Sequence, residues 1–434
     1  MDTINKKDEI FNKINNVFSQ VINIDSPESI TETINIIKEN MLNIGADILE
    51  YWITNIFPNK LEKNNTLSDN IKFKGFVEKT YLSTLGEVKI NRAYYYDSKN
   101  KKAFYPMENK HPFLKDYCLP DMKEIICFTS CLNPFDLTQE IIEKLTGIRV
   151  STSQIQKITK QIGSKLVDKE EYEIENPPKY TASRIKIDKM VLSMDGAMIK
   201  TYDDWKEVKS GVIYEIKKKS DSLSSINKSY ISKIEDCHSF QKRIKQEARR
   251  RHYLDAKALA VIGDGARWIW DLAEKEFPLA AQIVDWYHAK QHLCSAINLL
   301  YDNKKSKESD ELLKKCSDLL YNGNIEELEK VIRAKIYDNK IIDRLDDLVV
   351  INTEIEYFIK NKKRMQYAYF KANDWPIGSG IIEAACKQLV QLRLKRNGMK
   401  WKKDVAHCVL KLRCMYLSGR WDEVKSSINI KKAA

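Results

Sequence analysis

The chain has 434 residues, of which 43% are hydrophobic and 31% are charged, and its formal net charge at pH 7 is +12. This length and apolar content predict a globular protein with two or three packed cores. No stretch is long and apolar enough to span a membrane, and the first residues lack the apolar segment of a secretory signal, which together favour the cytoplasm. Nine scattered cysteines without a C-x-x-C pair indicate reduced thiols.

The N-terminal third reads as helices followed by a small β-hairpin. Residues 1 to about 75 show helical spacing of apolar side chains, and residues 81–96 predict two short strands joined by a turn. Residues 137–166 then predict a helix, a short turn and a second helix, which begins with a capping box of Ser151 and Gln154. Gln154, Lys157 and Lys160 would face outward from this helix-turn-helix and contact DNA, although many helical hairpins bind nothing.

Strands and helices alternate from residue 185 to about residue 300. The predicted strands are 189–195, 207–216, 228–234, 257–263 and 280–285, and the predicted helices are 238–252, 267–277 and 287–301. Three successive strands followed by helix, strand, helix, strand and helix is the order of a ribonuclease-H-like α/β core. The fold class predicted is therefore multidomain α/β, with a mixed sheet at its centre.

Residues 302–371 show only helical repeats and predict an all-helical insertion. The segment 375–380 then breaks the pattern and leads into a helix that starts at Ile381. Glu383, Lys387 and Gln391 would form one polar stripe on this helix. The opposite, apolar face would consist of Ile382, Ala385, Leu389 and Leu392.

Three carboxylates stand at places suited to a metal site. Asp195 and Asp264 each begin an Asp-Gly-Ala tripeptide after a short apolar run, so each should project from a strand end, and Glu383 follows on its helix. Hard divalent cations such as Mg²⁺ favour oxygen ligands, and two such ions support in-line phosphoryl transfer. The alternatives are that each Asp-Gly pair is an ordinary turn and that Glu383 only complements its helix dipole.

A second group of polar residues follows the fifth predicted strand. Asp285 ends that strand and could reach the same cleft, and His288 could contact DNA or orient a neighbour. A buried, hydrogen-bonded histidine is the simpler interpretation. His288 and His292 have the i, i+4 spacing of metal ligands but no evident third ligand, so zinc is poorly supported.

Basic residues concentrate near the C-terminus. From Cys386 to Ala434 there are 13 Lys or Arg against 3 Asp or Glu, a balance that favours binding of nucleic-acid phosphates over a merely soluble surface. Trp401 could stack on an unpaired base or could pack against the next helix. The helix 238–252 is also basic and would contact the DNA backbone or simply be solvated. The candidate DNA-binding residues here are Lys387, Arg393, Lys395, Arg396, Lys400 and Trp401.

Four stretches carry a resemblance to a known family: SMDGAMIK (193–200), VIGDGARWIWDLAEKEFPLAAQIVDWYHAKQHL (261–293), PIGSGIIEAACKQLVQLRLKRNGMKW (376–401) and SGRWDEV (418–424). With these the chain resembles bacterial insertion-sequence transposases of the Kra group, within the Mutator-like DDE enzymes. The resemblance implies that Asp195, Asp264 and Glu383 are the catalytic, metal-binding triad. Asp285 and His288 are similar to the supporting (C/D)-x-x-H signature of this superfamily.

The same resemblance implies a ribonuclease-H-like fold interrupted by a helical insertion, and two Mg²⁺ ions for which Mn²⁺ can substitute. It implies cleavage at terminal inverted repeats of double-stranded DNA, strand transfer into target DNA, and a homo-oligomer at synapsis in the bacterial cytoplasm. Relatives commonly carry a cysteine pair after a segment like 86–95, and this chain has none there. A zinc ribbon is therefore not expected.

These predictions divide the chain into five parts. They are an N-terminal helical region with a hairpin (1–110), a helix-turn-helix-like region (111–178), the first part of the core (179–301), the helical insertion (302–372) and the core completion with the basic tail (373–434). The leading hypothesis is a DDE transposase. The alternatives are a catalytically silent DNA-binding protein of the same fold and a nuclease without strand transfer.

Overall fold

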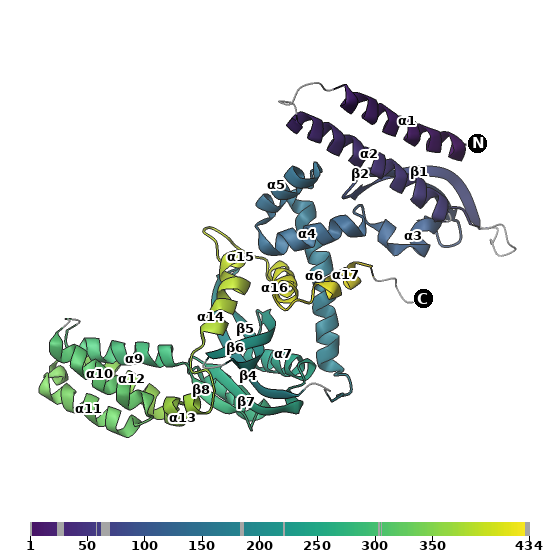
Figure 1. The fold of residues 1–434 in the computed structure, drawn as a ribbon. Coiled ribbons are helices and arrows are strands. Elements are labelled where there is room, and N and C mark those ends of the chain that lie inside the picture. The colour runs from purple at the N-terminus through teal and green to yellow at the C-terminus, as the bar shows by residue number, and fades with distance from the viewer. Residues whose placement is uncertain are drawn as a thin grey trace. The chain divides into compact units, whose positions relative to one another are not determined.

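The computed structural model describes residues 2–23, 30–57, 59–61, 70–182, 186–219, 222–302, 304 and 306–429. It is a mixed α/β protein with a three-stranded antiparallel sheet and a five-stranded mixed sheet (Figure 1). Two compact units divide the chain, one of Met1–Ile162 with Trp421–Ala434 and the other of Gly163–Arg420. Among the described helices, none combines the length and the apolar character needed to cross a membrane.

The first unit begins with two helices beside the smaller sheet. Its elements are α1 (Asp2–Ile22), α2 (Ile30–Ile56), β1 (Ile71–Ser83), β2 (Gly86–Asp97), β3 (Lys102–Phe104), α3 (Pro106–Lys110) and the 3-10 turn η2 (Pro112–Lys115). The predicted hairpin is present, with Ser83 opposite Gly86 at its turn. Strand β1 starts ten residues before the predicted start, because a register shift between Phe73 and Gly75 breaks the alternation that identifies a strand.

The predicted helix-turn-helix corresponds to α5 (Phe135–Thr146) and the beginning of α6 (Thr152–Glu175), a helix that passes from the first unit into the second after Ile162. The first unit also contains α4 (Pro120–Leu132) and α17 (Trp421–Asn429). Helix α5 ends at Gly147 in the left-handed conformation, at φ 73°. The Ser151–Gln154 capping box is confirmed, since each backbone N–H donates to the other residue's side chain at 3.3 Å. Ile155, Ile158 and Ile162 are buried as predicted.

The second unit is built on the five-stranded sheet. Its strands are β4 (Ile187–Lys200), β5 (Trp205–Lys219), β6 (Ser222–Lys233), β7 (Ala256–Gly263) and β8 (Ala281–Val284). The order across the sheet is β6-β5-β4-β7-β8. Strands β4, β5 and β6 pair antiparallel, whereas β7 pairs parallel with both β4 and β8. All five predicted strands are therefore present, and they form one mixed sheet.

Helices connect and extend this sheet. They are α7 (Cys237–Arg250), α8 (Arg267–Glu276), α9 (Trp286–Leu300), α10 (Lys307–Tyr321), α11 (Ile325–Asp338), α12 (Leu345–Asn361) and α13 (Tyr367–Ala372), with 3-10 turns η3 (Tyr253–Asp255), η4 (Ile341–Asp343) and η5 (Lys362–Arg364). The described residues between 302 and 372 contain no strand, as predicted. Apolar side chains of the sheet and of α9 to α13 form one continuous core.

The helix that carries Glu383 is not regular. It consists of α14 (Gly380–Cys386), the π-helical segment η6 (Lys387–Gln391) and α15 (Leu392–Leu394), and α16 (Lys403–Leu417) follows it. A π-turn inserts one extra residue, so the inward face shifts by one position beyond it. Leu392, predicted on the apolar face, is consequently 51% exposed, and Arg393 is buried in its place.

Candidate active site

Asp195 lies within a strand rather than at its end. Strand β4 continues to Lys200 because its antiparallel partner β5 extends beside it, and Asp195 pairs with Ser210. The prediction of a strand end was wrong for this reason. The parallel ladder with β7, however, stops at Ser193, two residues earlier. Asp195 thus stands where one neighbouring strand ends, and its carboxylate accepts a hydrogen bond from the Gly196 N–H at 2.7 Å.

Asp264 directly follows β7, the parallel neighbour of β4. The last pair of the β4–β7 ladder is Ser193 with Ile262, so Asp195 and Asp264 both come two residues after the end of that ladder. Strand β7 ends at Gly263, as predicted for this aspartate, and Gly265 has a φ of +107° in the turn that follows. The Asp264 carboxylate accepts from the Ala266 N–H at 2.9 Å.

The turn after Asp264 is held by a side chain distant in sequence. The Tyr357 hydroxyl on α12 donates to the backbone oxygen of Asp264 at 2.9 Å. A Cβ on Gly265 would lie 2.5 Å from the Tyr357 ring, so this close approach requires glycine. Helix α12 is therefore in direct contact with the turn that carries the second aspartate.

Glu383 projects from the first turns of α14 and is exposed. Its Oε1 accepts a hydrogen bond from the Ser379 hydroxyl at 2.9 Å. The Ser379 N–H in turn donates to Oδ2 of Asp285 at 2.5 Å, and Oδ1 of Asp285 accepts from the His288 N–H at 2.9 Å. The fully buried Asp285 thus connects the start of α9 to the loop that precedes Glu383.

Electrostatics place the three carboxylates in one neighbourhood. The pKa of Asp195 is raised above its usual value by burial first, and further by the negative charges of Asp264 and Glu383. Hydrogen bonds from the Gly196 N–H and the Cys386 thiol oppose this rise. Burial, followed by the Asp195 charge, also raises the pKa of Cys386, which keeps that thiol protonated. Residues nearly 190 positions apart in sequence therefore act on one carboxyl group.

His288 and His292 contact each other, and the carboxylate next to them, Glu354, is not placed to complete a metal site. Nε2 of His288 and Nε2 of His292 are 3.2 Å apart, and Nδ1 of His292 lies 2.5 Å from Oε2 of Glu354. The His292 ring also stacks on Tyr357, with 3.9 Å between ring centroids. Glu354 contacts the outer nitrogen of His292 and is not a third ligand beside the two Nε2 atoms. Within the described residues, no three His, Cys, Asp or Glu side chains are arranged to hold one ion.

Two predicted DNA-binding residues are buried, so those predictions were wrong. Arg393 is 0% exposed, and its guanidinium lies over the Trp401 ring at 4.9 Å. Trp401 is 5% exposed and donates its indole N–H to the Leu394 carbonyl at 2.9 Å. The π-turn explains the first burial, since it rotates Arg393 inward. Backbone hydrogen bonds of Trp401 with Lys200 and Tyr202 explain the second, since they fix the tryptophan beside β4.

The other candidates for DNA contact remain at the surface. Lys157 and Lys160 on α6 are exposed, whereas Gln154 is half-buried and engaged in the capping box. Of the C-terminal cations, Lys387, Lys395, Arg396 and Lys400 are exposed, whereas Lys411 and Arg413 are buried. Arg413 donates to the backbone oxygens of Gln388 and Leu389 in the π-helical segment. Part of the C-terminal basic charge is thus internal structure and does not form a surface.

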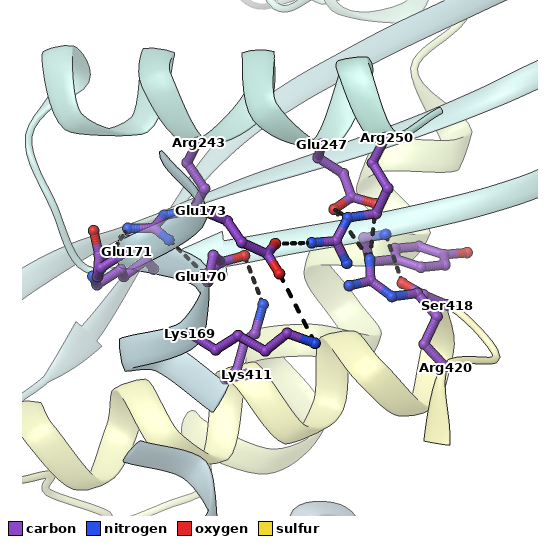
Figure 2. Close-up of polar contacts among 12 residues, drawn as sticks. Lys169, Glu170, Glu171, Glu173, Arg243, Glu247, Arg250, Lys411, Ser418 and Arg420 are labelled. Carbon is purple, nitrogen blue, oxygen red and sulfur yellow. Dashed lines mark hydrogen bonds and ion pairs between the residues drawn. The ribbon is translucent and has the colours of Figure 1, made fainter. Parts of the chain in front are cut away.

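The basic helix α7 is partly buried: Lys242 is exposed, whereas Arg243 lies inside the protein. Arg243 is 2% exposed and contacts three carboxylates, at 2.5 Å to Glu170 and 2.6 Å to Glu171 (Figure 2) and at 2.7 Å to Glu235. Arg250 of α7 pairs with Glu173, which lies on α6 together with Glu170 and Glu171. Helix α6 extends to Glu175, nine residues past the predicted end at 166. The prediction followed the apolar stripe of this helix, and its last turns instead carry glutamates that pair with the buried cations Arg243 and Lys411.

Several residues of the site were not found from the sequence. Ser379 stands in the Gly-Ser-Gly segment before α14 and could have been flagged by its position, because serine commonly precedes a helix. Tyr357, Glu354 and Cys386 had no such signal. They lie in ordinary helical patterns, and only folding brings them to the carboxylates.

Comparison with known families gives one match. The model of the uncharacterised protein family UPF0236 matches residues 24–427. Because this match covers most of the chain, the chain belongs to that family. A search of curated proteins found none that matches.

Proposed function

We propose that this member of the UPF0236 family is a DDE-type DNA transposase of an insertion sequence, with Asp195, Asp264 and Glu383 as its catalytic carboxylates. The observation that carries the proposal is the placement of Asp195 on β4 and of Asp264 directly after the neighbouring parallel strand β7, with Glu383 near enough for its charge to raise the pKa of Asp195. Like charges gathered at one place are costly unless a cation or a reaction uses them, and such clusters are typical of active sites.

The sheet supports the same proposal. Its order, with three antiparallel strands followed by two parallel ones, agrees with the ribonuclease-H-like core expected from the sequence. Asp195 and Asp264 then lie on the first and fourth strands of that core, which are neighbours. The helices α10 to α13 lie between α9 and α14 in the chain and would be the insertion.

The residues present fit magnesium in kind. Asp195, Asp264 and Glu383 offer only oxygen donors, and Mg²⁺ in proteins is usually held by one or two carboxylates, with water and substrate phosphate as its other ligands. Three protein ligands on one ion are therefore not required. When bound, divalent cations would activate an attacking water or 3′-hydroxyl and would stabilise the leaving oxygen.

The protein's own contribution would be positioning. Asp285 fixes the backbone at Ser379, and the Ser379 hydroxyl orients one oxygen of Glu383. Tyr357 fixes the turn after Asp264. Rigid placement of the carboxylates matters because a displacement of about 1 Å can cost roughly 100-fold in rate. Lys157 and Lys160, and separately Lys387, Lys395, Arg396 and Lys400, would bind phosphates of double-stranded DNA.

The experiment is a cleavage and joining assay with purified full-length protein. Its substrate is DNA that contains the sequences flanking the coding region, where terminal inverted repeats are expected. With Mg²⁺ or Mn²⁺ we expect cuts at the repeat ends and joined products with a second, unrelated DNA, and chelation of the metal should abolish both. DNA binding without any cut would instead identify a silent DNA-binding protein, and cuts without joining would identify a nuclease.

A further inference from the structure

Helix α2 carries an apolar side that the described residues leave largely exposed, although the Trp52 ring on it meets the Phe57 ring edge-on at 5.3 Å. Ala46 and Ile53 of this helix are buried in the core of the small sheet. Helix α1 runs beside α2 (Figure 1), and its Lys6 and Lys13 form ion pairs with Glu50 and Asp47. A third side of α2 bears six large apolar residues that are 38–65% exposed. These residues, here called the α2 stripe, are Ile30, Ile34, Ile37, Met41, Ile48 and Trp52.

The stripe has the regularity of a helix-pairing seam. At the 3.6 residues per turn of an α-helix, its six side chains fall within an arc of about 60°. Most of their spacings are three and four residues, as in the seam along which two helices pack. Helix α2 has 27 residues, so the seam would be up to about 40 Å long.

The charge of α2 argues against nucleic acid as the partner. The helix contains four acidic residues and a single lysine, Lys38, although the whole chain is strongly basic. DNA phosphates would therefore be repelled. The four acids, Glu32, Glu39, Asp47 and Glu50, all lie more than about 100° around the helix from the centre of the stripe. Two copies of α2 can thus approach along their stripes without like charges meeting.

The exposed area suits a dimer. A buried aromatic side chain removes roughly 150–250 Å² from water and isoleucine or methionine somewhat less, so six half-exposed side chains offer on the order of 500 Å² of apolar surface. With the polar residues beside the stripe, each copy approaches the roughly 800 Å² per partner of a stable interface. Single exposed apolar residues are ordinary on a monomer, but six of them within one narrow arc of a helix, interrupted only where Ile44 is buried, mark a contact surface.

We propose that the α2 stripe binds the same stripe of a second copy of this chain. A two-fold axis places one patch against an identical patch, so a second copy always supplies a stripe of matching length and spacing. The acidic residues of α2 lie away from the stripe, which permits this pairing, and burial of the apolar side chains drives it. The pairing does not depend on the chemistry proposed for the carboxylates.

The test is the mass of the full-length protein in solution, measured by sedimentation. The wild type should have twice the 50.6 kDa of one chain. A variant with Ile34→Glu and Met41→Glu should have the mass of one chain and an unchanged helical circular-dichroism signal. The matched control is Leu279→Glu with Leu345→Glu, two residues that are 94% and 70% exposed in the other unit, and it should remain a dimer.

A second measurement, photo-crosslinking, does not require a charged substitution that could destabilise the fold. A photo-crosslinking amino acid at position 41 should yield a covalent dimer, and the same group at position 279 should not. A wild type of single-chain mass at all concentrations would overturn the proposal, and so would a dimer that the stripe variant leaves intact. A monomeric wild type whose stripe variant unfolds more readily would show that the stripe is covered within its own chain, which also overturns it.

Discussion

Replacing Asp264 by asparagine should lower DNA cleavage by at least about 1,000-fold, which corresponds to roughly 4 kcal/mol of transition-state stabilisation. Asparagine keeps the size of the side chain and an acceptor for the Ala266 N–H, but it removes the charge that a divalent cation requires. Asp195→Asn and Glu383→Gln should have effects of the same order. The initial rate of cutting on repeat-end DNA in Mg²⁺ measures each one.

Urea unfolding of the same variants distinguishes a catalytic carboxylate, whose loss leaves the fold stable, from a structural one, whose loss destabilises it. The pKa of Asp195 is raised in the folded protein, so its charged form is disfavoured there and costs stability at neutral pH. Asp195→Asn should therefore unfold at the same or a higher urea concentration than the wild type. The matched control is Asp188→Asn, an exposed aspartate on the same strand, which should cut DNA normally. Normal cleavage by the Asp264 or Glu383 variant would remove these residues from the proposed triad.

The second large effect concerns stability alone. Arg243→Met should reduce the free energy of unfolding by about 3–5 kcal/mol, because it leaves buried carboxylates without their main counter-charge. Glu170 illustrates the cost. Burial works against its charge, yet Lys411 at 2.6 Å and Arg243 hold its pKa at about 2 (Figure 2). Urea unfolding of the full-length protein at neutral pH gives the value.

A surface ion pair in the same unit provides the control for this prediction. Arg333 pairs with Glu329 at 2.8 Å on the outside of α11, and Arg333→Met should cost less than about 1 kcal/mol. The pH dependence has a definite sign. Because the pKa of Glu170 is depressed, its contribution is present above the ordinary glutamate value near 4.5 and is lost as the pH falls towards 2. An Arg243 variant as stable as the wild type would show that the cluster contributes little.

The strands of the second unit could be predicted because local patterns determine them. Short apolar runs bounded by glycine or polar residues identified β4, β5, β6, β7 and β8, and the helices between them, to within a few residues at most ends. Where β4 ends could not be predicted, since that depends on how far β5 accompanies it past Asp195. The two aspartates were found by their repeated tripeptide, but that both follow the end of one parallel ladder is known only from the strand pairing.

Basic residues were the least predictable feature. The sequence gives their number and position along the chain, but it does not show which cations form ion pairs inside the protein. Arg243 looked like part of a solvated or DNA-binding face, and two of the three carboxylates that neutralise it lie on α6, about 70 residues earlier. Arg393 and Leu392 exchanged places because of one π-turn, which has no clear signal in the sequence.

Contacts of the helical region with the site were also beyond sequence reasoning. Tyr357 reaches the Asp264 backbone, and Glu354 reaches His292, from α12. Both residues occupy positions in an amphipathic pattern that indicates only a helix. The link from Asp285 through Ser379 to Glu383 was likewise hidden, because it joins the ends of two elements more than 90 residues apart.

Iron-directed backbone cleavage tests most directly the central claim, that three distant carboxylates form one divalent-cation site. Fe²⁺ replaces Mg²⁺ in such sites, and with ascorbate and peroxide it generates radicals that cut the chain beside the bound ion. We predict fragments from cuts near residues 195, 264 and 383 together, all suppressed by excess Mg²⁺ and all lost in Asp264→Asn. Cuts at none of these segments, or at only one of them, would contradict the account.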